Sequence, residues 1–510
     1  MTSPLEGWTT IKYVGRRHAA PALLTVAMFC IAAGTGASAT TERLSVSTTG
    51  DQAFSDTTGL SVSRTGRFVA FDSDSYNLVP NDGNTTTDTF LRDRDTDRDG
   101  IFDEPGKVKT VRISVSPEGT DQIGASQGET SISAGGRFVA FVSNGFNLVP
   151  GDQTLTASIY VRDRDTDRDR IFDEPGAVKT VRVSDPAVYP FGSYSPCISA
   201  NGRFVTFNSA SPDLVADDTN DVDDLFLHDR DTDGNGVFDE PGTVGTIRLS
   251  VSSDDTEADL ASGAGCFSHN SRYVTFTSVA TNLVSGDANG TGDVFIRDRD
   301  TDSDGIYDEP GSVSTFRVSE ASDGTEGNGF SFAGGISSSG RFIAFSSDAS
   351  NLVAGDTNGA RDTFVRDRDP DRDGVFDEPG EISTVRVSTS AVGDEGDWYS
   401  SGGSISRTGR FVGFTSSAGN LVPGDTNGHA DSFVVDRDSD RNRVFDEPGG
   451  IAIARISLTA VGGQIQNAES TGGILSANGR WGFFTSDAFG IDDPDLAIWN
   501  RDTYARGPLR

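Results

Sequence analysis

Lysine, histidine and cysteine are scarce in this 510-residue chain, and its body lacks long apolar runs. Only four lysines occur (Lys12, Lys107, Lys109 and Lys179), so arginine supplies almost all of the positive charge. The formal net charge of −35 argues against a nucleic-acid partner and against an anionic membrane surface. A hydrophobic fraction of 35% together with 60 glycines favours a loop-rich, all-β protein built from short strands.

The N-terminus has the features of a cleavable export signal. Two arginines precede an apolar run from Ala19 to Ala33, and Ala37-Ser38-Ala39 forms a small-x-small cleavage site. The run is short for a membrane span, and no second candidate follows it. We therefore expect residues 1–39 to be a signal peptide. Residues 40–510 would then be a single secreted or periplasmic domain, without stable membrane insertion after cleavage.

A Gly-Arg-aromatic landmark divides the remaining chain into seven repeats. It stands at residues 66, 136, 202, 271, 340, 409 and 479, with Ser replacing Gly at 271. The second repeat shows four strand-like runs, GETSISA, RFVAFVS, SIYVRDR and VKTVRVS, joined by turns or loops. Each repeat is therefore expected to form a four-stranded antiparallel sheet. Repetition of such sheets about an axis covers their faces and leaves only short edges.

The two ends of the chain indicate that the repeats close into a ring. The seventh repeat ends after LAIWNRDT without a fourth strand. The segment that follows the signal, TERLSVSTTGD, matches TVRISVSPEGTD of the first repeat, with Arg43 in the place of Arg112. We predict a seven-bladed β-propeller in which the N-terminal strand completes the last blade, and we expect this ring to be monomeric.

These repeats resemble a known family. SAGGRFVAFVS, SANGRFVTFNS and SSSGRFIAFSS, each followed by a strand that ends in RDRD, are similar to TolB-like, WD40-like propeller repeats over roughly residues 42–505. The resemblance implies the propeller fold. It implies little about function, because propellers serve many roles.

An acidic segment stands between the third and fourth strand of the first six repeats. The first copy, RDRDTDRDGIFDEPG, places Asp95, Asp97 and Asp99 at alternate positions and Gly100 next. Carboxylates at positions 1, 3 and 5 followed by Gly at position 6 match the front half of an EF-hand loop, where calcium takes six to eight oxygen ligands. The Ile101 carbonyl would be the ligand at position 7, and Asp103 the ligand at position 9, directly or through water.

The acidic segments also resemble the short DxDxDG calcium loops of thrombospondin type 3 repeats, which implies structural Ca²⁺ with Glu104 or water at the remaining positions. We expect a left-handed conformation at position 6, where a residue other than glycine costs roughly 1 kcal/mol. Four loops should therefore be competent, because the second and sixth loops have Arg170 and Arg443 in place of the glycine. The predicted ligands are Asp95, Asp97, Asp99, Ile101 and Asp103; Asp231, Asp233, Asn235, Val237 and Asp239; Asp300, Asp302, Asp304, Ile306 and Asp308; and Asp369, Asp371, Asp373, Val375 and Asp377.

Charge accumulates in these loops. From the Asp before position 1 to the closing Gly, the six loops together carry −22 of the formal −35. The alternative is a set of solvated acidic hairpins, with pairing of the Arg94 type, in a protein adapted to high salt, which low lysine and high aspartate also fit. Solvation alone does not require aspartates at every second position followed by glycine, so we favour calcium.

Two further features leave alternatives open. The segment NLVAGDTNGARD at 351–362 and its relatives could form an Asx-type turn, which we favour, or another ion site through Asp356, Asn358 and Asp362. Cys197 and Cys266 occupy equivalent places in neighbouring repeats. We expect them to be two small buried thiols, with a disulfide as the alternative if the equivalent strands approach closely enough.

No catalytic constellation is evident. His228, His269 and His429 occupy three different contexts, so a histidine-centred cluster is not expected. GASQG at 124–128 matches a nucleophile-elbow pattern but lacks its strand-turn-helix context. The recurrent arginine of each landmark is interpreted as a strand-end salt bridge. We favour an exported calcium-binding scaffold or binding module with a protein or glycan partner; the alternative is a secreted polysaccharide- or peptide-active hydrolase or lyase with a site in the central channel.

Overall fold

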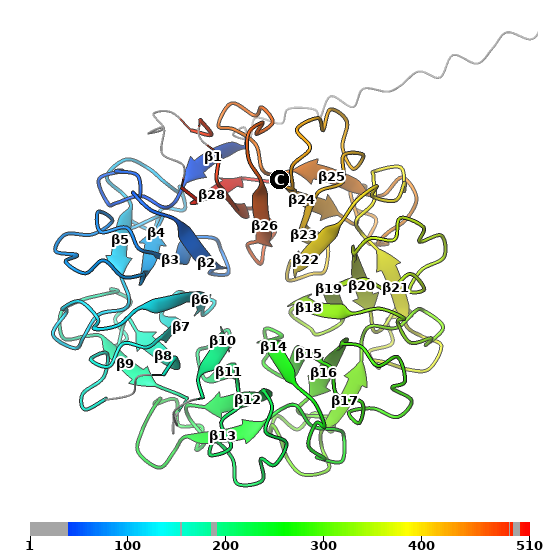
Figure 1. Cartoon of the computed structure of the whole chain (residues 1–510), viewed down its shortest axis with the longest axis horizontal. Coiled ribbons are helices and arrows are strands. Elements are labelled where there is room, and N and C mark those ends of the chain that lie inside the picture. The colour runs from blue at the N-terminus through cyan, green and yellow to red at the C-terminus, as the bar shows by residue number, and fades with distance from the viewer. Residues whose placement is uncertain (1–38, 153–155, 185–190, 489, 493–499, 510) are drawn as a thin grey trace, which may run out of the picture. The chain divides into compact units, whose positions relative to one another are not determined.

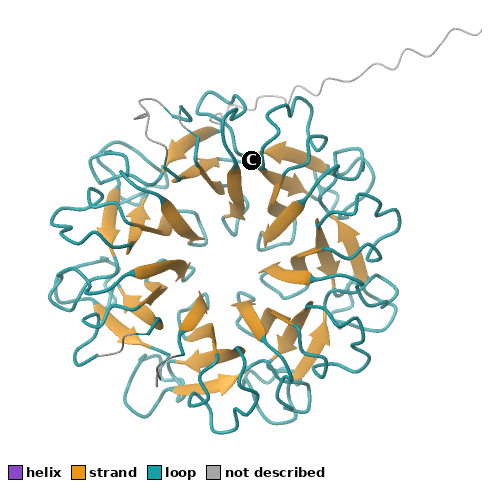
Figure 2. Cartoon of the chain, in the orientation of Figure 1, coloured by secondary structure: helices purple, strands orange, loops and turns teal. Residues whose placement is uncertain are grey.

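Seven sheets of four antiparallel strands surround a common axis, as the repeats predict (Figure 1). The computed structural model describes residues 39–152, 156–184, 191–488, 490–492 and 500–509. All but the last residue of the predicted signal peptide therefore lies outside the described residues. Strands and loops make up the described part of the chain, with no helix among them (Figure 2). The fold is thus an all-β, seven-bladed propeller.

Each blade runs from an inner strand to an outer strand in chain order. The inner strands are β2 (Thr57–Val62), β6 (Ser126–Ile132), β10 (Ser193–Ile198), β14 (Ser262–Phe267), β18 (Ser331–Ile336), β22 (Ser400–Ile405) and β26 (Ser470–Leu475). The second strands are β3 (Phe68–Ser73), β7 (Phe138–Ser143), β11 (Phe204–Ser209), β15 (Tyr273–Ser278), β19 (Phe342–Ser347), β23 (Phe411–Ser416) and β27 (Gly482–Ser486).

The third strands are β4 (Asp88–Asp93), β8 (Ser158–Asp163), β12 (Asp224–Asp229), β16 (Asp293–Asp298), β20 (Asp362–Asp367), β24 (Asp431–Asp436) and β28 (Asp502–Gly507). The outer strands are β5 (Lys109–Arg112), β9 (Lys179–Arg182), β13 (Gly245–Arg248), β17 (Ser314–Arg317), β21 (Ser383–Arg386), β25 (Ala452–Arg455) and, for the last blade, β1 (Thr40–Arg43).

The middle strands of each blade form the core between neighbouring sheets. β3 and β4 are buried along their whole length, and the Phe71 and Phe90 rings stack across them at 6.0 Å. The inner strands instead consist largely of small residues, because they converge on the axis. A Cβ atom on Gly334 would lie 2.6 Å from the carbonyl oxygen of Ala344 and 2.7 Å from that of Gly403 in the next blade. A larger side chain there would push two blades apart.

The ring closes through its two ends, as predicted. β1 pairs antiparallel with β28, so that Arg43 lies opposite Tyr504 and Thr40 opposite Gly507. Residues from the start of the propeller thus form the outer strand of the blade that ends it. The third strand of that blade, DTYARG, begins where the predicted LAIWNRDT ends. Part of the predicted segment, 493–499, lies outside the described residues.

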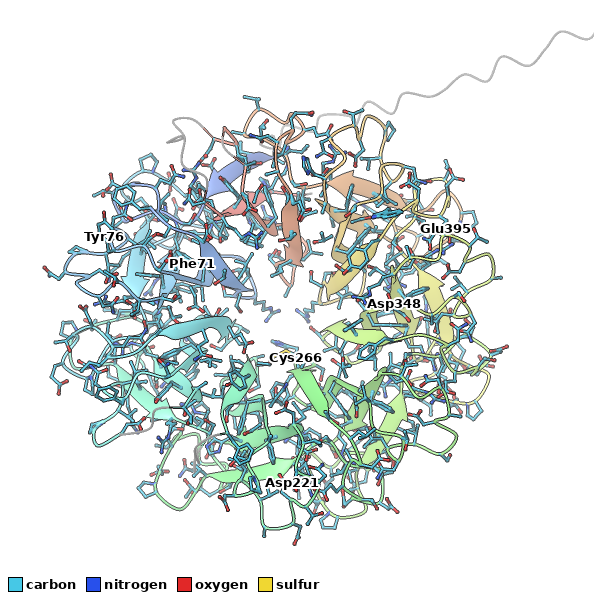
Figure 3. All side chains as sticks on the ribbon, in the orientation of Figure 1. Phe71, Tyr76, Asp221, Cys266, Asp348 and Glu395 are labelled. Atoms are coloured by element: carbon cyan, nitrogen blue, oxygen red, sulfur yellow. A yellow bond between two sulfur atoms is a disulfide. The ribbon has the colours of Figure 1, made fainter. Side chains whose placement is uncertain are left out.

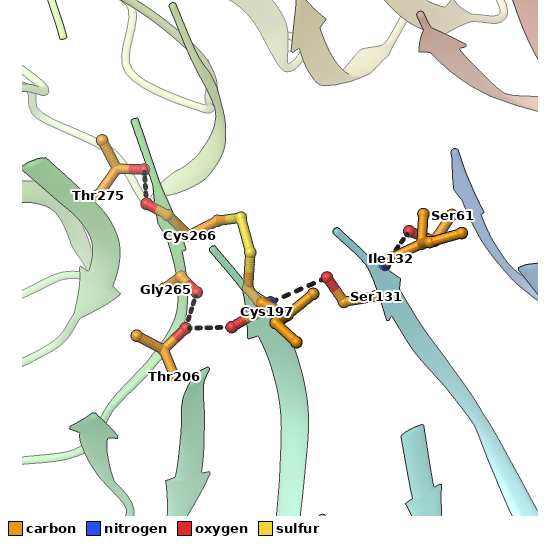
Figure 4. The surroundings of a disulfide bond; sticks show 9 residues. Ser61, Ser131, Ile132, Cys197, Thr206, Gly265, Cys266 and Thr275 are labelled. Atoms are coloured by element: carbon orange, nitrogen blue, oxygen red, sulfur yellow. Dashed lines mark hydrogen bonds between the residues drawn. A yellow bond between two sulfur atoms is a disulfide. The ribbon is translucent and has the colours of Figure 1, made fainter. Parts of the chain in front are cut away.

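Cys197 and Cys266 form a disulfide between β10 and β14 (Figure 4). The expectation of two free buried thiols is therefore wrong. Both cysteines lie on inner strands, where neighbouring blades approach most closely, and their Cα atoms are 5.4 Å apart. This separation lies within the usual range for a disulfide. Figure 3 shows Cys266 near the axis of the ring.

Candidate metal centres on the acidic hairpins

The acidic segments join the third strand to the outer strand of blades 1 to 6. In blade 1, Nη1 of Arg94 donates to the carbonyl oxygen of Gly66 at 2.8 Å, which places the segment beside the turn between β2 and β3. The same contact joins Arg164 to Gly136, Arg230 to Gly202, Arg299 to Ser271, Arg368 to Gly340 and Arg437 to Gly409. All six segments therefore extend from the same end of their blades, on one face of the ring.

Alternate carboxylates converge within these loops. Oxygen atoms of Asp95, Asp97 and Asp99 all lie within 4.8 Å of one another, and so do those of Asp300, Asp302 and Asp304. Asp95 is nearly buried, and its two oxygens accept the Asp99 and Gly100 amides at 3.1 Å. The first aspartate thus shapes the loop, and the next two project toward solvent beside it. Three anionic groups at this spacing are a candidate centre for a hard cation.

Position 6 adopts the left-handed conformation that the spacing predicts. Its φ is 87° at Gly100 and 89° at Gly305, and it is 72° at Arg170 in the second loop. A left-handed arginine costs roughly 1 kcal/mol relative to an unstrained residue. Asp165, Asp167 and Asp169 of the second loop nevertheless converge within 4.8 Å, as in the loops with glycine. If the second loop binds calcium more weakly, the cause is therefore backbone strain at Arg170, because its carboxylates converge as they do in the other loops.

The aspartate at position 9 pairs with the arginine that opens the loop. In blade 1, Nε and Nη2 of Arg94 donate to Oδ2 of Asp103 at 2.9 and 2.5 Å, and the arginine is fully buried. The pair recurs as Arg164–Asp173, Arg230–Asp239, Arg299–Asp308, Arg368–Asp377 and Arg437–Asp446. The predicted ligands Asp103, Asp239, Asp308 and Asp377 thus pair with buried guanidinium groups, which is the Arg94-type pairing that the high-salt alternative includes.

The glutamate at position 10 lies close to the converging carboxylates. Burial, followed by the charges of Asp304, Asp302 and Asp300, raises the pKa of Glu309. In the third loop, Nδ2 of Asn235 donates to Glu240 at 2.8 Å. Glutamate at position 10 is therefore a candidate for a further side-chain ligand, as the sequence predicts for Glu104.

The residues at position 7 project their side chains outward. Ile101, Val237, Ile306 and Val375 are 44–56% exposed. The backbone carbonyl at this position is the predicted ligand, which leaves the side chain free of any role in binding. In the first loop Lys107 pairs with Asp97 at 2.9 Å, so one loop already holds a side-chain cation beside its second ligand.

The aromatic residue at position 8 joins each loop to the preceding blade. In blade 4, the Arg299 guanidinium lies 4.8 Å from the ring centre of Tyr307 and 4.3 Å from that of Phe204 in blade 3. The equivalent aromatic pairs are Phe102–Trp481, Phe172–Phe68, Phe238–Phe138, Phe376–Tyr273 and Phe445–Phe342. The sequence does contain a signal for this contact, because an arginine and an aromatic residue recur at fixed places in all six loops. The contact between blades was not predicted from that recurrence.

The other predicted local features are present. The landmark Arg67 donates from Nε and Nη2 to both oxygens of Asp93 at 2.7 and 2.6 Å, which confirms the strand-end salt bridge. In the segment NLVAGDTNGARD at 351–362, Oδ1 of Asn358 accepts the Ala360 amide at 2.7 Å, which confirms the Asx-type turn. Ser126 of GASQG begins β6, where its buried hydroxyl accepts a hydrogen bond from Thr89 at 2.9 Å.

No helix in the described part of the chain is long and apolar enough to span a membrane. No protein-family model matches the chain, and no curated protein does. Solved structures that resemble it include TolB from Acinetobacter baumannii, with 13% identity over 64% of this chain and 56% of that chain and a TM-score of 0.31. The β-propeller domain of the Trilobed protease from Pyrococcus furiosus has 11% identity over 89% of this chain and 95% of that chain, with a TM-score of 0.44. Oligogalacturonate lyase from Vibrio parahaemolyticus has 11% identity over 92% of this chain and 97% of that chain, with a TM-score of 0.45. At these values the likenesses carry no argument about function.

Proposed function

We propose that this chain is an exported, calcium-binding propeller that serves as a binding or scaffold module. The observation that carries the proposal is the convergence of three carboxylates within 4.8 Å in the acidic loops. Such groups repel one another, and a divalent cation between them removes the repulsion. Each ion would be held by the aspartates at positions 1, 3 and 5, with Asn235 at position 5 of the third loop, and by the carbonyl at position 7. The aspartate at position 9, directly or through water, and the glutamate at position 10 would complete the set of ligands.

An ion in a loop would act on the boundary between blades. The loop that includes Asp300, Asp302 and Asp304 also supplies Arg299 and Tyr307, which pack against Phe204 of the preceding blade. A loop fixed by calcium would therefore hold its aromatic residue in place. A ligand that binds only the folded state stabilises that state, so calcium would stabilise the ring as well as the hairpin.

Export is supported by the disulfide between Cys197 and Cys266, because such bonds persist in oxidising compartments outside the cytoplasm. The module's partner would be a protein or a glycan. No observation on the described residues favours the hydrolase or lyase alternative. The seven inner strands contribute one carboxylate, Glu129, which accepts the Ser195 amide.

The experiment that tests the proposal is metal counting on the purified chain after dialysis against micromolar calcium. We expect several bound ions per chain, and one fewer in Asp302→Asn. Asp213→Asn, which removes an exposed carboxylate outside the acidic loops, is the matched control and should leave the count unchanged. No bound calcium in the parent chain would favour the high-salt alternative. Turnover in a parallel screen of glycans and peptides would favour the enzyme.

A further inference from the structure

A second group of carboxylates lies on the face opposite the acidic loops. In blade 3, oxygen atoms of Asp218, Asp224 and Glu257 lie within 4.8 Å of one another, and Asp287, Asp293 and Glu326 repeat the arrangement in blade 4. The strand β12 starts at Asp224 on this face and ends at the acidic loop on the other. Glu395, the blade 5 counterpart of Glu257, lies farther from the axis than Cys266 (Figure 3).

One arginine faces the three carboxylates in each group. In blade 3, Nη1 of Arg248 donates to Glu257 at 2.5 Å but lies 3.5 Å from Asp218 and 3.6 Å from Asp224. In blade 4, Arg317 binds Glu326 and stands 3.9 Å from Asp287. Each group therefore has three negative charges against one positive charge. In blade 3 the glutamate has the close ion pair, and both aspartates lie farther from the arginine.

The first aspartate of each group has a buried oxygen atom that accepts no hydrogen bond. The side chains of Asp218 and Asp287 are each 2% exposed, and Oδ2 of both receives no hydrogen bond. The other carboxylates are satisfied: Asp224 accepts Ser250 at 2.5 Å and Asn220 at 2.9 Å. Burial and the neighbouring carboxylates raise the pKa of Asp218 and of Asp287 to about 6. A buried anionic oxygen that accepts no hydrogen bond is costly unless a cation or proton meets it closely.

Blade 6 provides an internal comparison. Gln464 stands there in place of the glutamate, and its Nε2 donates to Asp425 at 2.9 Å. Arg455 then reaches the other oxygen of Asp425 at 2.8 Å. With two carboxylates instead of three, the aspartate has partners at both oxygens. In blades 3 and 4, by contrast, Oδ2 of the first aspartate accepts no hydrogen bond.

We propose that the Asp218–Asp224–Glu257 and Asp287–Asp293–Glu326 groups each bind a hard divalent cation, with calcium as the expected ion. The excess charge of −2 in each group equals the charge of one such ion, and carboxylate oxygens are its preferred ligands. Oδ2 of Asp218 and Oδ2 of Asp287 would be direct ligands. These two sites are separate from the acidic loops and do not depend on them.

The test compares calcium counts between variants that mimic blade 6 or reverse it. Glu257→Gln with Glu326→Gln should lose two ions relative to the parent, because the amide supplies the missing donor as Gln464 does. Gln464→Glu should gain one ion. Equal counts in all three chains would overturn the proposal and indicate that the groups share protons instead.

Crystals of the unaltered chain soaked in Mn²⁺ give a second test that needs no variant. Anomalous peaks beside Oδ2 of Asp218 and of Asp287 would support the proposal. Peaks confined to the acidic loops would overturn it while leaving the proposed function intact. Peaks on the opposite face alone would support these two sites and would contradict the proposal that the acidic loops bind calcium.

Discussion

The guanidinium of Arg299 lies 4.3 Å from the ring centre of Phe204, although the two residues belong to different blades. The same arginine donates to Asp308 of its own loop at 2.6 Å from Nη2. One buried cation therefore joins an acidic hairpin to the neighbouring sheet. This contact connects the charge of the hairpins to the integrity of the ring.

Removal of this arginine should destabilise the ring strongly. Arg299→Met leaves Asp308 partly buried without its cation and removes the stacking on Phe204, so we expect a loss of about 3 kcal/mol in the free energy of unfolding. The measurement is urea denaturation followed by tryptophan fluorescence. Arg407→Ala, at an exposed arginine, is the control and should stay within about 0.5 kcal/mol of the parent. Equal midpoints for both variants would contradict the role assigned to Arg299.

Arg170→Gly should stabilise the second loop. Arg170 has a φ of 72°, and glycine adopts this conformation without steric strain, so we expect a gain of roughly 1 kcal/mol. The reciprocal change, Gly305→Arg at a φ of 89°, should produce a loss of similar size in the fourth loop. Thermal unfolding in chelator isolates the backbone effect from any ion. A stabilised Gly305→Arg variant would show that the backbone conformation does not limit these loops.

The disulfide should contribute to stability in the absence of calcium. Cys197 and Cys266 are separated by 69 residues, and a crosslink of this span typically contributes about 2–4 kcal/mol. We expect reductant to lower the unfolding midpoint of the parent chain. A Cys197→Ser, Cys266→Ser variant should start from the lower midpoint and show no response to reductant. Quantitative thiol labelling of the unreduced, unfolded parent would contradict the assignment.

Asp72 should make stability fall as pH rises. Its side chain is fully buried, and burial raises its pKa from 3.8 to about 8. The folded state therefore holds a proton that the unfolded state releases above about pH 4. The contribution of Asp72 to the free energy of unfolding is therefore fully present below pH 3.8 and is lost as the pH rises to about 8. Asp72→Asn, which copies Asn208 of blade 3, should become progressively more stable than the parent between pH 5 and 8. A constant difference across that range would refute this.

Much of the fold follows from local sequence patterns. The Gly-Arg-aromatic landmark marks each turn between the first two strands, and the match between the two ends predicts the pairing of β1 with β28. The left-handed position 6 and the Asx-type turn were also predicted, because both depend on residues within a few positions of one another. Local chemistry therefore identifies the loops and their shape.

The contacts between blades were not predicted, because they join residues about one repeat apart. Nothing in the local sequence shows that the loop arginine inserts between its own aromatic residue and that of the preceding blade. The same limit explains the disulfide, since the approach of inner strands depends on the radius of the ring.

Thermal unfolding of the purified chain at constant ionic strength, in calcium, in magnesium and in chelator, tests most directly whether calcium binds the acidic hairpins. Neutralised hairpins would hold the aromatic residues between blades, so we predict a clear rise of the midpoint in calcium, a smaller rise in magnesium, and a calcium effect reduced in Asp302→Asn. An identical midpoint in all three conditions would contradict this prediction.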